Sequence, residues 1–151
     1  MINYLIHRTP NGWNVFWEFN TQVSIQEAWQ WFVTNDKLHT WFPQLSFHDD
    51  HLLFHIEGQD SINLRVTAYQ PEKFIDFEWF GASIHMAILD AGNFRRITFE
   101  EELPHDFPHP MRDMTGWVVN GYIVQALMEG QPVPDRSDLI STIQQKIAEV
   151  M

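Results

Sequence analysis

Apolar and polar positions alternate along the stretch from Trp13 to Phe19, where tryptophan, valine and phenylalanine recur at every second position. A period of two in aromatic and β-branched residues is typical of a strand with one buried face. The pattern changes at Ser24-Ile25-Gln26-Glu27, a capping box in which the Ser24 hydroxyl and the Glu27 carboxylate each satisfy a free backbone N–H. We therefore expect a strand followed by a helix.

Two short helices are predicted after this strand. In the first, apolar residues recur at helical spacing from Ile25 to Phe32. Asn35 or Asp36 can cap the second, whose apolar positions are Leu38, Trp41 and Phe42. Pro43 ends it, because proline lacks the N–H that a helix interior needs.

Between residues 44 and 103 the period returns to two. Alternating apolar positions predict strands near residues 52–56, 62–69, 75–79, 83–88 and 97–100. Asp90-Ala91-Gly92-Asn93 is a run of turn residues and predicts a hairpin between the last two strands. Since the connections are short, we expect antiparallel neighbours, so the region should form a meander.

The last third of the chain is helical in pattern. A broad apolar stripe runs through residues 111–129, and Gly130 is placed to end that helix. Asp135 can cap a final helix with a second stripe, made of Leu139, Ile140, Ile143, Ile147 and Val150.

These elements predict an α+β fold of the helix-grip type. A sheet with one apolar face must cover that face, and the long helix is the element available to do so. Because sheets twist, we expect a curved antiparallel sheet of six to seven strands wrapped around the long C-terminal helix, with two short helices after strand 1 and an extra C-terminal helix. Residues 1–130 would form the helix-grip domain, and residues 131–151 a helical extension of it.

The segment from Ser24 to Pro43, reading SIQEAWQWFVTNDKLHTWFP, resembles the opening helix pair of the Hsp90-ATPase-activator-homologue group in the START and Bet v 1-like superfamily. Thr115-Gly116-Trp117 is similar to the Gly-Trp helix of that group, and Phe94–Glu102 to its last strand. The likeness covers roughly residues 13–130. The segment Pro104–Pro110 is longer than in the group's pattern, and the helix after Pro134 has no counterpart in it.

This resemblance implies the helix-grip fold and, for most members, binding of hydrophobic small molecules. A few members are cyclases or hydrolases, and a eukaryotic co-chaperone gives the group its name. Fold resemblance alone does not settle function.

Charge and composition narrow the range of partners. The chain has 20 acidic and 9 basic residues, a formal net charge of -11, and no run of Lys or Arg. Nucleic acids and anionic membranes are bound through clustered cations, so we expect neither as a partner. The acidic surface either serves solubility alone or forms a face for a basic protein partner.

Further classes are excluded by the residues that are missing. The chain has no Cys, which excludes disulfides, thiolate catalysis and Cys-ligated zinc. Met1–Pro10 lacks an apolar signal region, and no stretch approaches the length of a membrane span. We therefore expect a cytoplasmic protein.

The chain is rich in rings, with 12 Phe and 7 Trp. These rings either pack solid or line an adaptable apolar cavity between the sheet and the long helix. For the second case the expected ligand-binding residues are Trp13, Phe54, Trp79, Met86, Phe99, Glu101, Met114, Trp117, Asn120 and Gly121.

Glu101 is the one catalytic candidate, and a weak one. It is in register with Ile97 and Phe99, so its carboxylate can point inward near the start of the long helix. Burial among tryptophans would raise its pKa and suit it to proton transfer or to holding a ligand hydroxyl. Alternatively the strand frays there and Glu101 lies in water.

The eight histidines do not predict a metal site. His51 and His55 lie on one face of a predicted strand but about 13 Å apart, too far to share an ion. His105 and His109 lie in a proline-containing loop that supplies no defined ligand geometry. We therefore expect neither a bound metal nor another cofactor. No Gly-x-Ser-x-Gly elbow is present, so we do not expect a nucleophilic triad either.

Three functions remain at this point. The first is binding of a small hydrophobic or aromatic ligand. The second is a co-chaperone-like module that acts on an Hsp90-type ATPase, and the third is a cyclase-like or hydrolase-like pocket enzyme. The C-terminal helix is also expected to support a homodimer.

Overall fold

The computed structural model describes residues 2–151 and places nine strands in two antiparallel sheets. The large sheet has the order β1 (Asn3–Thr9), β2 (Gly12–Thr21), β9 (Arg95–Pro104), β8 (Ala82–Asp90), β7 (Phe74–Trp79) and β6 (Val66–Gln70). The small sheet consists of β3 (Leu45–His48), β4 (His51–Phe54) and β5 (Ile62–Leu64).

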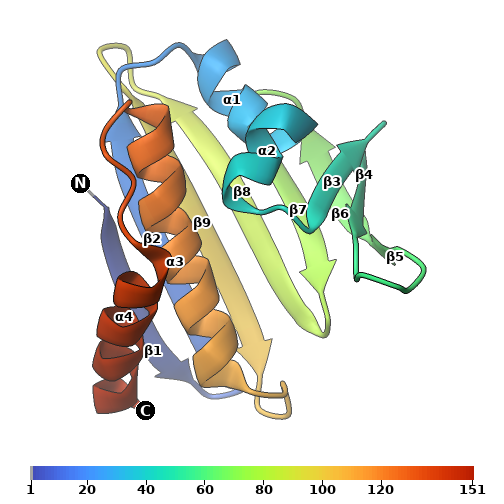
Figure 1. Ribbon diagram of the computed structural model, residues 1–151, viewed down its shortest axis with the longest axis vertical. Helices are drawn as coiled ribbons and strands as arrows, with labels where there is room; N and C mark the ends of the chain where they lie inside the picture. The colour runs from blue at the N-terminus through green and yellow to red at the C-terminus, as the bar shows by residue number, and fades with distance from the viewer. Residues whose placement is uncertain (1) are drawn as a thin grey trace.

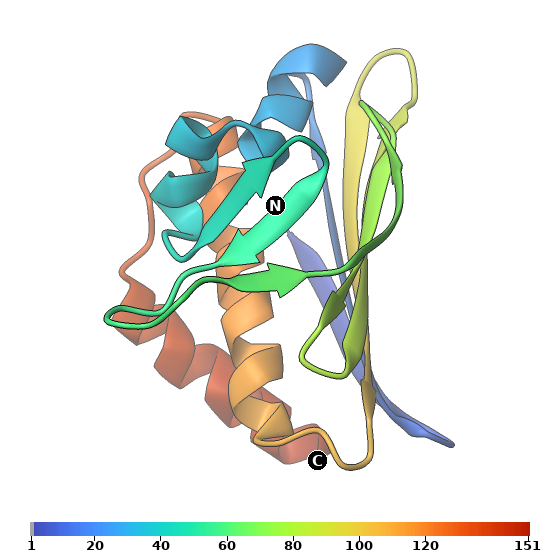
Figure 2. The same ribbon diagram turned by 90° about the vertical axis from the view of Figure 1, so that its right-hand side faces the viewer.

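Within these described residues, four helices complete the fold: α1 (Ile25–Val33), α2 (Asn35–Trp41), α3 (Pro110–Met128) and α4 (Arg136–Val150). The long helix α3 lies across one face of the large sheet, and α4 lies beside it (Figure 1). Viewed from the side, the small sheet crosses in front of α3 on the same side of the large sheet (Figure 2). The predicted α+β helix-grip architecture is confirmed, including the extra C-terminal helix.

The first strand, β1, was not predicted from the sequence. β1 pairs with β2 along its length, and the two short helices therefore follow the second strand rather than the first. The turn Pro10-Asn11-Gly12 was the available signal, because Asn-Gly favours a tight hairpin. Only glycine fits at position 12, since an added Cβ would lie 1.8 Å from the Leu103 carbonyl oxygen on β9.

The predicted strand over residues 62–69 is in fact two strands in different sheets. β5 ends at Leu64 and pairs with β4, whereas β6 begins at Val66 and pairs with β7. Between them, the Arg65 carbonyl accepts a hydrogen bond from the Glu78 N–H at 2.9 Å. Alternation of apolar and polar residues predicts which side chains of a strand are buried, but not which strand lies next to it. The change of sheet therefore could not be predicted from the pattern. β3 was also not predicted.

Side-chain caps fix the helix starts. The Ser24 hydroxyl accepts from the Glu27 N–H at 3.1 Å, and the Asp135 carboxylate accepts from the Asp138 N–H at 2.9 Å, as predicted. The predicted cap of α2 is wrong, because Thr34 occupies that position without a side-chain hydrogen bond. The Asn35 amide instead bonds the Phe47 backbone, accepting at 2.8 Å and donating at 3.2 Å, and so ties α2 to β3.

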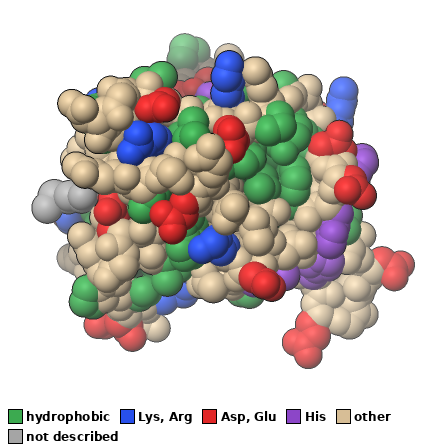
Figure 3. Space-filling model, turned by 90° about the horizontal axis from the view of Figure 1, so that it is seen from above, with side chains coloured by type: hydrophobic (Ala, Val, Ile, Leu, Met, Phe, Trp, Pro, Cys, Tyr) green, Lys and Arg blue, Asp and Glu red, His purple; other side chains and the backbone are tan. Residues whose placement is uncertain are grey.

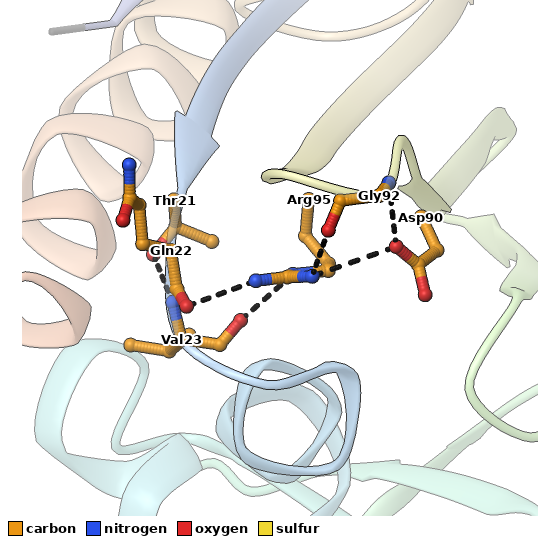
Figure 4. A network of polar contacts seen from close by, with 6 residues as sticks. All are labelled: Thr21, Gln22, Val23, Asp90, Gly92 and Arg95. Carbon is orange, nitrogen blue, oxygen red and sulfur yellow. Dashed lines mark hydrogen bonds and ion pairs between the residues drawn. The ribbon is translucent and has the colours of Figure 1, made fainter.

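Arg95 joins the end of β2 to the β8–β9 hairpin (Figure 4). Its guanidinium donates to the carbonyls of Gln22 and Val23, both at 2.9 Å, and to the Gly92 carbonyl at 3.2 Å. It also pairs with Asp90 at 3.5 Å. This one side chain fixes the chain between β2 and α1 against the predicted hairpin turn.

The middle of α3 packs tightly on β2 and β9. The Trp17 ring stacks on Phe99 with centroids 5.2 Å apart, and its indole N–H donates to the Trp117 carbonyl at 3.0 Å. An added Cβ on Gly121 would lie 2.7 Å from Trp17, so glycine permits the close approach of the helix. No space remains here for a ligand.

α4 packs against its own chain. Ile143 and Ile147 are buried in the main core, while Ile140 and Val150 stay exposed. Arg136 donates to the Trp41 carbonyl at 3.2 Å and to Asn120 Oδ1 at 3.1 Å, which ties α4 to α2 and α3. Among residues 2–151, no helix has both the length and the apolar character needed to cross a membrane.

Candidate functional site

A cleft of about 440 Å³ opens beside the first half of α3. It is bounded by the β9–α3 loop, the β7–β8 turn and the ends of α2 and β4. The loop and the turn lie toward the lower end of the molecule in Figure 1. Its lining residues are Phe42, Phe54, Trp79, Phe80, Phe107, Pro108, His109, Arg112, Asp113, Gly116, Trp117 and Asn120. The cleft therefore lies between sheet and helix, where the helix-grip fold leaves a gap.

One wall of the cleft is aromatic. The centroid of Trp79 lies 5.3 Å from Trp117, 5.8 Å from Phe42 and 5.4 Å from Phe54, with interplanar angles of 75° to 85°. Rings at such steep angles pack edge to face, which matches their quadrupoles and holds them in place. The wall presents apolar surface whose shape is fixed before any ligand arrives.

Two residues at the cleft have strained backbones. Phe80 and Gly81 form the β7–β8 turn with φ of 49° and 98°, as in a type I′ turn, where Asn-Gly is the usual pair. His109, just before α3, has φ 53°. A bulky residue with positive φ costs free energy, and such strain collects at functional sites. The strained turn holds the Phe80 ring beside Trp79 and Phe54.

Two carboxyl groups meet at the base of the cleft. Glu101 on β9 is fully buried, and within residues 2–151 its oxygens have no partner other than the Asp113 carboxyl. Asp113, in the first turn of α3, lines the cleft and accepts from the Trp79 indole N–H at 2.8 Å. Its second oxygen is buried and has no partner outside the pair among these residues. Because β9 continues to Pro104, Glu101 does not fray into water.

The two carboxyl groups influence each other's pKa. Burial raises the pKa of Glu101 well above its usual value, and the hydrogen bond with Asp113 and the charge of Asp113 raise it further. Burial also raises the pKa of Asp113, whereas hydrogen bonds from Glu101 and Trp79 oppose that rise. The raised pKa of Glu101 favours its protonated form, and the hydrogen bond from Trp79 favours the carboxylate form of Asp113.

Four of the expected ligand-binding residues line the cleft: Phe54, Trp79, Trp117 and Asn120. Glu101 lies behind Asp113 and does not line it. The other five are buried in the packed core outside the cleft, namely Trp13, Met86, Phe99, Met114 and Gly121. Binding by any of these residues remains a prediction.

Most of the polar residues and mouth residues of the cleft were not among the predicted ligand-binding residues. Asp113 and Arg112 lie in the first turns of a helix, where their spacing looked like an ordinary solvated face. Phe80 precedes Gly81 between two alternating strands, so an aromatic in a hairpin turn was the signal to notice. Phe107 to His109 belong to the segment already seen as longer than the family pattern.

Other histidines lie away from the cleft in hydrogen-bonded positions. His55 lies beyond the end of β4 and contacts the hydroxyls of Ser46 at 2.9 Å and Ser61 at 2.7 Å. The His39 ring contacts the same Ser46 hydroxyl at 3.0 Å. Among residues 2–151, no three His, Asp or Glu side chains gather as metal ligands would.

No family model and no curated protein sequence matches the chain. Solved structures share its fold. The conserved protein of unknown function EF2215 from Enterococcus faecalis has a TM-score of 0.83 at 19% identity, over 99% of this chain and 92% of its own. CalU16 from Micromonospora echinospora has a TM-score of 0.69 at 13% identity, over 99% and 97%. The Aha1 dimer from Colwellia psychrerythraea has a TM-score of 0.62 at 19% identity, over 77% and 96%.

At these identities the likenesses show the fold alone. The solved structures share the helix-grip fold that the sequence resemblance implied, whereas membership of the START and Bet v 1-like superfamily, or of the Hsp90-activator group within it, remains a prediction. The alignments with EF2215 and CalU16 extend over almost the whole chain, so α4 has counterparts in those folds. The alignment with the Aha1 dimer covers only 77% of the chain, so the expectation that the last helix has no counterpart in the Hsp90-activator group stays a prediction.

Proposed function

We propose that this protein binds a small hydrophobic or aromatic ligand in the cleft between α3 and the β7–β8 turn. The observation that carries the proposal is an aromatic-walled cleft of about 440 Å³, a volume in the range of small-molecule sites. The strained backbones of Phe80 and His109 support it, since strain retained at a cleft mouth needs a purpose beyond folding.

Gly116 offers a way to test this proposal without disturbing the fold. It lines the cleft from within α3, and an added Cβ would meet nothing within 4 Å. Gly116→Leu therefore fills the cleft with a side chain that also favours helix. The variant should be at least as stable as the wild type and should lose binding.

The measurement is a titration with the neutral fluorophore N-phenyl-1-naphthylamine, followed by quenching of tryptophan fluorescence. We expect saturation at one probe per chain in the wild type and no saturable binding in Gly116→Leu. Ser83→Leu, at an exposed position on β8 outside the cleft, is the matched control and should bind as the wild type does. Equal binding by the wild type and Gly116→Leu would overturn the proposal.

The co-chaperone alternative has support from the fold alone, through the likeness to the Aha1 dimer. On the face viewed in Figure 3, acidic side chains are scattered among other types rather than gathered into one patch. Dimerisation through α4 likewise stays a prediction, with Ile140 and Val150 as the exposed apolar residues it would use.

An acid–base enzyme is the second candidate, and one observation favours it. Glu101 and Asp113 are two neighbouring buried carboxyl groups with raised pKa values next to a cleft, as in catalytic carboxyl pairs. Glu101 reaches the cleft only through Asp113, so Asp113 would exchange the proton with a substrate. If a substrate is found, Asp113→Asn should lower kcat far more than KM, and an unchanged kcat would dismiss the enzyme.

A further inference from the structure

The carboxyl pair beside the cleft has no cation to balance it. Among residues 2–151 the ion pairs are Asp50–His51, Arg65–Glu78, Asp76–His85 and Asp90–Arg95, and none includes Glu101 or Asp113. The residues that face Glu101 across the sheet are Val15 on β2 and Ile84 on β8, both apolar and buried. In the described part of the chain, the only donor to the pair from outside it is the Trp79 indole N–H.

A buried negative charge without a partner is costly, and proteins seldom keep one without a use. Within residues 2–151, three of the four carboxyl oxygens have no partner other than the neighbouring carboxyl, and the carboxyl that lines the cleft belongs to Asp113. A positively charged group entering the cleft would supply the counter-charge that the pair lacks. Glu101 is fully buried with Asp113 as its sole polar partner, which favours a ligand that completes the pair.

The aromatic wall is suited to the same kind of group. Trp79 and Trp117 lie next to Asp113, and the faces of tryptophan rings attract cations more strongly than those of other aromatic residues. A carboxylate beside several aromatic rings is a combination that recognises organic ammonium groups. The rest of the wall, which includes Phe42 and Phe54, would hold the apolar part of the same molecule.

Two basic side chains also line the cleft, and by themselves they would favour an anionic ligand. Arg112 and His109 are both exposed, so water and salt screen them. Asp113 is much more buried, and charges interact more strongly where water is excluded. The buried charge should therefore determine the preference, and binding of an anion at the rim is the competing outcome.

We propose that the cleft selects an organic cation: an amine on an apolar or aromatic skeleton, with its ammonium group against Asp113 and the Trp79 and Trp117 rings. This inference rests on the proposed ligand-binding function and adds the chemical class of the ligand. The binding is non-covalent, and the exposed Arg112 and His109 would remain in water at the mouth.

The test compares three naphthalene probes of similar size by isothermal titration calorimetry at pH 7.5. 1-Naphthylmethylamine is cationic, 1-naphthalenemethanol is neutral and 1-naphthoate is anionic. We expect the amine to bind at least about tenfold more tightly than the alcohol, and the naphthoate to bind most weakly. Raising the salt concentration should weaken this preference only slightly, because the pair is buried.

The double variant Glu101→Gln/Asp113→Asn removes the charge of the pair and keeps the shape of both side chains. It should bind the amine no more tightly than the alcohol, while its affinity for the alcohol stays at the wild-type level and shows that the cleft is intact. Glu102→Gln, which changes the exposed neighbour of Glu101, is the control and should keep the preference for the amine.

Each other outcome has a definite meaning. Equal affinity for amine and alcohol would overturn the cation proposal and leave the ligand-binding function in place. Tighter binding of the naphthoate would also overturn it and would assign the polar contact to Arg112 and His109. If neither the three probes nor N-phenyl-1-naphthylamine saturates, the proposed function itself fails.

Discussion

The two parts of α3 face the same sheet and differ in what they do with it. Around Gly121 the helix lies flush on Trp17, and even one added methyl group would overlap the ring. Around Gly116, one and a half turns earlier, the same addition meets open space. One glycine lets two elements touch, and the other leaves room between them.

The polar groups of the two regions differ in the same way. In the packed part, the buried indole N–H of Trp17 is satisfied by the Trp117 carbonyl. In the open part, within residues 2–151, Glu101 and one oxygen of Asp113 are buried with only each other as polar partners. A folded interior normally pairs its polar groups, so the unsatisfied region is the one to examine for a ligand. Space and unsatisfied groups coincide in this protein.

The largest effect should come from the packed part. Trp17→Ala removes a fully buried ring that stacks on Phe99 and Phe19, together with its hydrogen bond. We expect the free energy of unfolding to fall by about 3–5 kcal/mol, as for other large-to-small core substitutions. Urea unfolding followed by far-UV circular dichroism measures it. A loss below about 1 kcal/mol would show that this region is not packed as described.

The two glycines give a paired comparison. Gly121→Ala should destabilise by about 1–3 kcal/mol, because the rigid Trp17 ring cannot move away from the new methyl group. Gly116→Ala should be neutral or stabilising by up to about 1 kcal/mol, since alanine favours helix and the site is open. Thermal and urea unfolding of both variants measure these changes in the free energy of unfolding. Equal effects would remove the distinction between the two parts of the helix.

The carboxyl pair makes stability depend on pH. The folded-state pKa of Glu101 is raised, so above the ordinary range of Glu the folded protein binds more protons than the unfolded chain. The stabilising contribution is complete below the unfolded-state pKa and is lost as pH rises through the raised pKa. We expect the free energy of unfolding to fall with pH in that window, and Glu101→Gln to reduce the fall. An identical slope in Glu101→Gln would contradict the assignment, whereas Glu102→Gln should behave as the wild type.

The smallest effect on stability should come from the strained turn. Phe80→Asn places the residue that a type I′ turn prefers at φ 49° and removes a ring that is 44% exposed. The relief of strain and the lost ring contacts oppose each other, so we expect the free energy of unfolding to change by less than about 1 kcal/mol. Binding of N-phenyl-1-naphthylamine should nevertheless weaken. A variant that is less stable and binds normally would assign Phe80 to folding alone.

Much of the fold could be predicted because periodicity and caps are local. The capping box at Ser24, the hairpin at Asp90–Asn93 and the stripe of α3 each depend on residues close in sequence. The change of sheet at Arg65 could not be predicted, because pairing partners are distant and alternation is the same for either neighbour.

The candidate site was harder to predict than the fold. Aromatic residues such as Phe99 and Trp79 have the same pattern along their strands, yet one is packed solid and the other lines a cleft. Glu101 could be placed inward from its register, but its partner Asp113 lies on another element and is brought near only by the β9–α3 loop. Space and pairing arise from tertiary structure, which residue spacing does not encode.

The tryptophans allow one spectrum to report on both regions at once. In a proton–nitrogen correlation spectrum, each indole N–H gives its own signal, and we assign those of Trp17, Trp29, Trp79 and Trp117 by substitution. On titration with N-phenyl-1-naphthylamine, the signals of Trp79 and Trp117 should move most and saturate at one probe per chain, while those of Trp17 and Trp29 should move little. Comparable movement of all four signals, or movement of Trp17 without Trp79, would contradict the claim that α3 is packed at one part and open to a ligand at the other.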